Sequence, residues 1–205
     1  MVPTKIGLVG DAGVGKTWFL FSIELKHQVV GIILISYLRS MLTVLAQNEF
    51  PELVTECENW EGLMTNSNDF YCTPYICDTI AEEKFFEIRT RIVYPHANMF
   101  LVAFSCVNST SLDSVKGKWV PEIRNCCPTR PILLVGTQCD LRGNESYVKT
   151  EVAQEVAEEM VAELNLAGYV ECSARYGTGV RAVLDKAMAI AKLELPPKKK
   201  KEKKN

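Results

Sequence analysis

The sequence lacks several features that mark common protein classes. Its eight cysteines include no C-x-x-C pair, which argues against a zinc site and against a thioredoxin-like redox motif. A disulfide framework is typical of much shorter secreted chains. No apolar segment of a secretory signal precedes Lys5. We therefore expect a protein of the reducing cytosol.

Histidine is scarce too. The chain has two histidines, His27 and His96, and both lie away from the polar motifs described below, so we expect them at the surface. With 205 residues, 47% hydrophobic and 23% charged, the chain fits one soluble domain with a core. The net charge of −2 hides an asymmetry, because residues 196–205 contain six lysines and one glutamate. A basic tail on an acidic body predicts a separate partner for the tail.

Apolar runs alternate with segments of helical periodicity. Strands are predicted at 5–9, 71–77, 99–105, 131–136 and 169–172. Helices are predicted from residue 16, near 82–93, and at 111–126, 151–165 and 179–193. This alternation predicts an α/β fold with a mostly parallel sheet flanked by helices. Ligands bind beyond the carboxyl ends of such strands, so polar motifs that follow strands are expected to converge.

The most informative motif is the G-x-x-x-x-G-K-[ST] segment at residues 10–17, which follows the apolar run at 5–9. Backbone N–H groups of such a loop surround a phosphate. Lys16 adds a charge for the outer phosphates, and Thr17 offers a hydroxyl to Mg²⁺. The N-terminus of the following helix attracts the same anion. The motif predicts a P-loop NTPase fold, with a chance match in a Gly-rich turn as the alternative.

Three more polar segments follow predicted strands. Asp78 can hold Mg²⁺ directly or through water. Asp140, in Thr137-Gln138-Cys139-Asp140, can accept two N–H bonds from guanine that adenine does not offer. Near Ser173 and Ala174 a backbone N–H can meet the guanine carbonyl. Each loop alone is typical of a structural turn, but the set in this order favours a GTP/GDP site over that of an ATP-using P-loop kinase.

At this point the chain resembles the Rho family of Ras-superfamily small GTPases, over residues 4–22 and 48–195. The resemblance rests on Tyr94-Pro95, on Lys118-Trp119-Val120-Pro121-Glu122, and on Thr137-Gln138-Cys139-Asp140-Leu141-Arg142. It implies a six-stranded sheet in a GTPase domain at 1–195. It also implies a GTP/GDP switch that signals to cytoskeleton or polarity effectors. Exchange factors and activating proteins of the Rho type are expected partners, and nucleic acid is not.

The resemblance also implies a set of site residues. The implied nucleotide-binding residues are Asp11, Ala12, Gly13, Val14, Gly15, Lys16, Thr17, Trp18, Thr55, Ala81, Thr137, Gln138, Asp140, Ser173 and Ala174. Implied Mg²⁺ ligands are Thr17, Thr55 and Asp78. The match at Thr55 is the loosest, because the stretch before it is short and lacks the usual Tyr. Implied catalytic positions are Lys16, Thr55, Glu82 and Glu83.

Two departures from the family concern hydrolysis. Ala12 stands where the family has Gly, and its methyl would crowd the attacking water and an incoming arginine finger. The usual Asp-Thr-Ala-Gly-Gln-Glu is replaced by the segment 78–83, Asp-Thr-Ile-Ala-Glu-Glu, in a switch one residue longer than usual. Glu82 or Glu83 therefore replaces the water-orienting Gln, and Ala81 or Glu82 replaces the Gly that meets the γ-phosphate. We predict nucleotide binding with weakened hydrolysis; the alternative is a hydrolysis-dead or nucleotide-free scaffold.

Two segments have no counterpart in the resemblance. Residues 29–47 form an apolar insertion whose polar positions share one helical face. A packed extension of the first helix, a membrane or partner helix, and a translated intron remain open for it. The tail at 196–205 follows two prolines and ends without a C-a-a-X box, so it predicts reversible, salt-sensitive binding to anionic membranes. The expected location is the cytoplasm and the inner face of the plasma membrane; a solvated tail or a nuclear import signal is the alternative.

Overall fold

The computed structural model describes residues 4–27, 74–79 and 81–193. Its sheet has five strands in the order β2-β1-β3-β4-β5, and every neighbouring pair is parallel. The strands are β1 (Thr4–Gly10), β2 (Pro74–Asp78), β3 (Met99–Ser105), β4 (Ile132–Thr137) and β5 (Gly168–Glu171). The α/β prediction is confirmed, and all five strands predicted by residue range are present. A sixth strand is not among the described residues.

Helices and helical turns follow the strands. They are α1 (Lys16–His27), η2 (Glu83–Phe85), α3 (Phe86–Ile88), η3 (Arg89–Val93), η4 (Tyr94–His96), α4 (Ser109–Ser114), η5 (Val115–Trp119), α5 (Val120–Cys126), η6 (Cys139–Leu141), α6 (Gln154–Glu163) and α7 (Val180–Leu193). The predicted helix at 111–126 begins two residues early, because the Asn108 side chain accepts a hydrogen bond from the Thr110 N–H and caps α4.

The predicted helix at 151–165 is too long at both ends. Ala153 is extended, and the Val152 N–H bonds the Cys106 carbonyl at 2.8 Å instead of entering a helix. Asn165 has a φ of +49°, which ends the helical path after Leu164. The prediction of 151–165 was therefore wrong at its ends, because a contact between distant segments takes the first residues.

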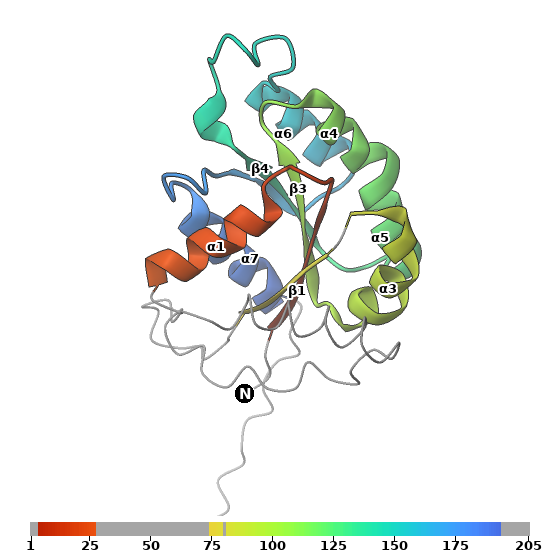
Figure 1. Ribbon diagram of the computed structural model, residues 1–205. Coiled ribbons are helices and arrows are strands. Elements are labelled where there is room, and N and C mark those ends of the chain that lie inside the picture. The colour runs from red at the N-terminus through yellow and green to blue at the C-terminus, as the bar shows by residue number, and fades with distance from the viewer. Residues whose placement is uncertain (1–3, 28–73, 80, 194–205) are drawn as a thin grey trace, which may run out of the picture.

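The sheet lies between two helical layers (Figure 1). On one face, α1 and α7 bury a core with the strands; the members of this cluster include Ile6, Leu8, Phe19, Met99, Leu101, Leu133, Val183 and Leu184. On the other face, the helices from α4 to α6 bury a second core; its members include Val9, Tyr94, Phe100, Phe104, Trp119, Ile123, Leu134 and Met160. Both faces of the sheet are thus covered, which leaves the ends of the strands for ligand binding.

Gly10 fixes the exit of β1 toward this edge. Its φ is +148°, and a Cβ there would lie 2.3 Å from the Ala103 carbonyl oxygen of β3. Only glycine permits that approach, so the loop after β1 leaves close beside the end of β3.

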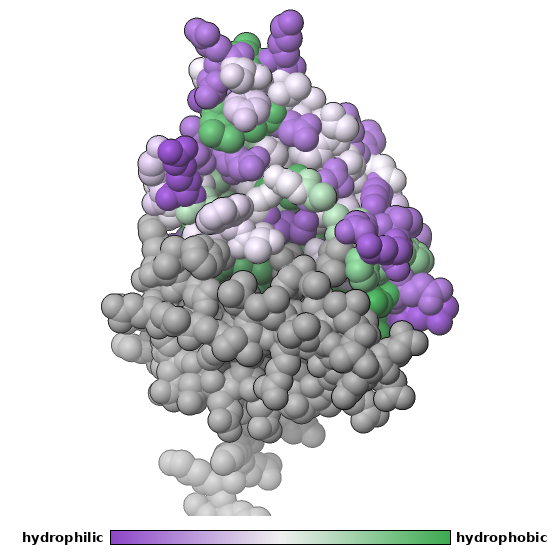
Figure 2. Space-filling view, viewed as in Figure 1, coloured by the Kyte–Doolittle hydropathy of each residue, from purple (hydrophilic) through white to green (hydrophobic). Residues whose placement is uncertain are grey.

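The surface of the described residues is mostly hydrophilic or of intermediate hydropathy in the view of Figure 2, with smaller hydrophobic areas between. His96 is exposed, as predicted. Cys106, Cys126, Cys127, Cys139 and Cys172 are free thiols. Among the described residues, no helix has the length and apolar character needed to cross a bilayer.

Candidate functional site

The loop between β1 and α1 has the geometry of a phosphate cradle. Gly13 and Gly15 have φ values of +78° and +89°, a backbone region that glycine adopts without strain. Lys16 is 8% exposed, and its Nζ donates to the carbonyls of Gly10 at 2.8 Å and Asp11 at 2.7 Å. The lysine therefore lies across the inside of the loop, where its charge fits an anion.

The loop after β4 is joined to the phosphate loop. The Thr137 hydroxyl lies within hydrogen-bond distance of the carbonyl oxygens of Val14 and of Phe104, the latter at 2.8 Å, and can donate to either. Gln138 has a φ of +58°, and its Nε2 lies 3.5 Å from the Gly13 carbonyl oxygen. These contacts bring the segments around residues 14 and 138 together, as the order of the motifs predicted.

The third loop, after β5, joins the same edge. The Cys139 N–H donates to the Cys172 carbonyl at 3.3 Å, and Ser173 is fully buried and paired with Thr178. Asp140 is half-buried in η6, and its carboxylate accepts no hydrogen bond from residues 4–27, 74–79 or 81–193. Its oxygens therefore fit the two N–H groups of a guanine edge.

Buried thiols lie beneath the base-side loops. Burial, with the nearby Glu171 carboxylate, raises the pKa of Cys106 to about 12, and burial also raises the pKa of Cys172. Arg142 holds Glu171, with NH2 and Oε1 2.5 Å apart. Both thiols therefore stay protonated and uncharged at neutral pH.

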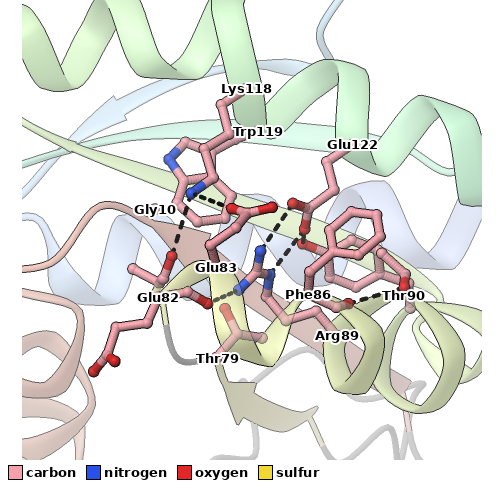
Figure 3. A network of polar contacts seen from close by, with 12 residues as sticks. Gly10, Thr79, Glu82, Glu83, Phe86, Arg89, Thr90, Lys118, Trp119 and Glu122 are labelled. Atoms are coloured by element: carbon pink, nitrogen blue, oxygen red, sulfur yellow. Dashed lines mark hydrogen bonds and ion pairs between the residues drawn. The ribbon is translucent and has the colours of Figure 1, made fainter.

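Figure 3 shows Glu82 and Glu83, of the segment at 81–83, with the side chains that hold this segment. The carboxylates of Glu82 and Glu83 are exposed and pair with lysines: Lys84 at 2.7 Å and Lys118 at 3.3 Å. The Lys118 Nζ also donates to the Ala81 carbonyl at 3.3 Å. The two carboxylates predicted to replace the family's Gln thus have cationic neighbours in this structure.

The anchors of this segment were missed as functional residues in the sequence. Arg89 donates to the Glu82 carbonyl at 2.8 Å, and the Trp119 Nε1 donates to Asp11 Oδ1 at 2.8 Å. The sequence signal that could have found Arg89 is an arginine inside a helix-like segment that packs on the sheet. In the sequence, Lys118 and Trp119 contribute only to the resemblance to the Rho family.

The remaining predicted residues are placed as follows. Thr17 is exposed in the first turn of α1, Asp78 is the last residue of β2, and Trp18 is 68% exposed. Ala12 is exposed in the phosphate loop, and Ala174 follows Ser173 in the third loop. Thr55 lies outside the described residues, as do the insertion at 29–47 and the tail at 196–205.

Magnesium would depend on few protein oxygens here. Within the described part of the chain, no cluster of three His, Cys, Asp or Glu residues could hold a metal ion. Mg²⁺ is typically held by one or two protein ligands together with substrate phosphates. Thr17, in the first turn of α1, and Asp78, the last residue of β2, stand at the same edge of the sheet as the phosphate loop, and these residue types fit that pattern. Bound there, Mg²⁺ would neutralise phosphate charge.

Comparison with known families assigns the chain. The model of the Ras family matches residues 39–192. The match includes the base-side loops and the segment at 81–96, and it begins after the phosphate loop at 10–17. The phosphate cradle is therefore an observation independent of the match. Proteins of this family bind GTP or GDP, typically with Mg²⁺, and act through effectors and regulators. The chain belongs to the Ras family and is a GTP-binding small GTPase switch.

Proposed function

We propose that this GTPase is a switch of the Rho type whose GTP hydrolysis is weakened. Three of the residues that suggest the Rho type, Tyr94, Trp119 and Glu122, form one buried cluster. The Tyr94 hydroxyl donates to Glu122 Oε1 at 2.6 Å, and Trp119 is fully buried beside them. A set of residues that works together in space is a stronger sign of common ancestry than the same residues scattered over the surface.

A π turn supports one reading of the extra residue in the segment. Hydrogen bonds in the turn at η3 span five residues rather than four, so this turn holds one residue more than an α-helical turn. On this reading the extra residue lies in the turn that begins at Arg89. Residues 78 to 88 then align with the family's segment without a shift. In that register Ala81 replaces the Gly that meets the γ-phosphate, and Glu82 replaces the water-orienting Gln.

The replacement of Gln by Glu82 is the observation that carries the proposal. A carboxylate has no N–H to donate and adds negative charge beside the phosphates. In the structure the Glu82 carboxylate is 2.7 Å from Lys84, so it is already engaged elsewhere. Ala12 adds a methyl where the family has Gly. Loss of water positioning or of an arginine finger costs up to about 10³–10⁵ in rate.

Single-turnover hydrolysis of bound GTP tests the proposal. We expect slow hydrolysis by the wild type and faster hydrolysis by the A12G/E82Q variant. Glu87→Gln is the matched control, because Glu87 is also exposed and paired with a cation, Arg91, at 3.5 Å. Rapid wild-type hydrolysis that a Rho-type activating protein stimulates would overturn the proposal. Purified protein without nucleotide would favour the scaffold alternative.

The proposal extends to location and partners. Rho-type effectors and exchange factors are the proposed protein partners. The lysine-rich tail at 196–205 is proposed to bind the inner face of the plasma membrane, because each lysine near an anionic leaflet contributes about 1 kcal/mol. Sedimentation with phosphatidylserine vesicles should show binding that 0.5 M NaCl abolishes. Binding that resists salt would contradict an electrostatic tail.

A further inference from the structure

The short segment at 81–83 is held by residues of the next helical layer. The Lys118 Nζ lies 3.3 Å from both the Ala81 carbonyl oxygen and Glu83 Oε2, and Arg89 NH1 lies 2.8 Å from the Glu82 carbonyl oxygen (Figure 3). Two of these three contacts are to backbone oxygens. They therefore fix the path of the chain, whatever the side chains of this segment do.

Arg89 is itself rigidly placed. It is 1% exposed and forms two bonds to Glu122, Nε to Oε1 and NH2 to Oε2, both at 2.9 Å. Tyr94 donates to the same carboxylate at 2.6 Å, and burial together with this bond raises the pKa of Tyr94, so its hydroxyl remains a donor. A buried bidentate pair with a third bond has one favourable geometry. Arg89 thus transmits the position of α5 to the Glu82 carbonyl.

Trp119 links the same layer to the phosphate loop. Its indole Nε1 donates to Asp11 Oδ1 at 2.8 Å, and its ring lies 5.2 Å from the Arg89 guanidinium and 4.4 Å from the Lys118 ammonium. The Asp11 carbonyl accepts from Lys16, the phosphate-binding lysine. One fully buried side chain therefore contacts the phosphate loop at one end and both anchors of the 81–83 segment at its face.

We propose that Trp119 and Arg89 are positioning residues that set the 81–83 segment against the phosphate loop, so that discrimination between GTP and GDP depends on them. The inference rests on the proposed function, because it needs a nucleotide in the cradle. In the family register the segment at 81–83 faces the outer phosphate, whereas among the described residues no hydrogen bond or ring contact joins Arg89 or Trp119 to the loops after β4 and β5. Loss of the contacts made by Trp119 and Arg89 should therefore weaken binding of the triphosphate more than binding of the diphosphate.

Trp119→Phe is the sharpest variant. It keeps a buried aromatic ring beside both cations, removes the N–H that reaches Asp11 and leaves a smaller ring in the same space. Equilibrium binding of fluorescent GMP-PNP and GDP to the full chain should show GMP-PNP affinity falling about 3- to 10-fold, the size of one net hydrogen bond, with GDP affinity within twofold. Asp11→Ala in the Trp119→Phe background should add less than Asp11→Ala alone, because both changes remove one bond.

A second variant and a control keep the result interpretable. Arg89→Lys retains the buried charge and loses the two-pronged bond, so it should shift the same ratio. Arg124→Lys is the matched control: this arginine, in α5, also donates to backbone carbonyls, of Pro128 at 3.1 Å and Arg130 at 2.7 Å, but away from the site. The ratio of GMP-PNP affinity to GDP affinity should not change in Arg124→Lys.

Equal losses of GMP-PNP and GDP affinity in Trp119→Phe, or an unchanged ratio, would overturn the positioning role, since a purely structural residue affects both nucleotides alike. The proposed function fails on different data. Fast hydrolysis by the wild type removes the weakened switch and leaves the positioning role standing. A wild type that binds neither nucleotide overturns both.

Discussion

The two sides of the nucleotide site follow different physical rules. The phosphate and base loops are fixed by backbone geometry: Gly10 has no room for a Cβ, and Gly13 and Gly15 adopt positive φ. The segment at 81–83 is fixed by side chains from another layer, chiefly Arg89 and Lys118. The first side carries the residues predicted to bind nucleotide together with the Ala12 departure, and the second carries the proposed replacement of the water-orienting Gln. We therefore expect nucleotide binding to depend mainly on the first side and hydrolysis on both.

The two sides tolerate substitution differently because one is shaped by steric limits on the backbone and the other is held through its carbonyl oxygens. A loop that wraps a phosphate with its own N–H groups needs glycine where φ is positive, as at Gly13 and Gly15, so a larger residue at those two positions would strain the loop. A segment held through its carbonyls tolerates side-chain changes, because Ala81 and Glu82 still offer the oxygens that Lys118 and Arg89 need. We therefore expect the proposed replacements of the family's Gly and Gln to leave the segment in place while they weaken hydrolysis.

The most disruptive single change is expected on the side-chain-held side. Arg89→Met leaves the Glu122 carboxylate buried without its partner; the paired side chains are 1% and 6% exposed. Removing one member of such a pair costs about 3–5 kcal/mol of unfolding free energy, measurable by urea denaturation. The exposed pair of Arg91 and Glu87 is the control, and Arg91→Met should cost less than about 1 kcal/mol. Similar losses in both variants would remove the claim that buried side chains hold this region.

On the backbone-held side, Lys16→Ala should abolish useful nucleotide affinity. It removes the cation that lies across the cradle, with bonds to the carbonyls of Gly10 and Asp11. A charge-assisted bond contributes about 1.5–3 kcal/mol, so the loss of this cation, which can make more than one such bond, should lower the affinity for nucleotide at least about 100-fold. Lys5→Ala, at an exposed side chain, is the control. The nucleotide released on denaturation measures the effect, and near-stoichiometric nucleotide in Lys16→Ala would contradict it.

Asp140→Ala should produce a smaller loss, confined to the base. The carboxylate accepts no hydrogen bond within the described part of the chain, so its removal affects the ligand rather than the fold. We expect GDP affinity to fall about 10- to 100-fold while weak binding of ADP is unchanged. Asp113→Ala, at an exposed position in α4, should change neither. Competition binding with both nucleotides checks this, and equal loss for GDP and ADP would mean that Asp140 does not select guanine.

Much of the backbone-held side could be predicted from the sequence. The phosphate loop and the loops after β4 and β5 are local motifs, and parallel strands must bring them to one edge. The side-chain-held region could not be predicted in the same way. Arg89 and Glu122 are 33 residues apart, and no local pattern pairs them. The sequence also leaves open whether Glu82 or Glu83 replaces the family's Gln, because the extra residue can be accommodated at any point of the segment; the π turn at η3 favours Glu82.

The smallest expected effect concerns the buried thiol of Cys106, beneath the loops after β4 and β5. The pKa of the Cys106 thiol is raised from 9.0 to about 12 by burial, with Glu171 adding to the shift. A group with a raised folded pKa stabilises the protein below the unfolded pKa and loses that contribution as the pH rises toward the folded value. Stability should therefore decline between about pH 9 and pH 12.

Cys106→Ala removes this titration together with some packing against Gly136, where a Cβ would lie 2.8 Å from the sulfur. The packing loss is present at every pH, so the diagnostic quantity is the change in unfolding free energy between pH 8 and pH 10. That change should be smaller in Cys106→Ala than in the wild type by about 1 kcal/mol. The exposed thiol of Cys126 provides the control variant, Cys126→Ala. If the unfolding free energy of Cys106→Ala falls between pH 8 and pH 10 as much as that of the wild type, the stability of the base side does not depend on keeping this thiol uncharged. The contrast between the two sides would then depend on backbone geometry alone.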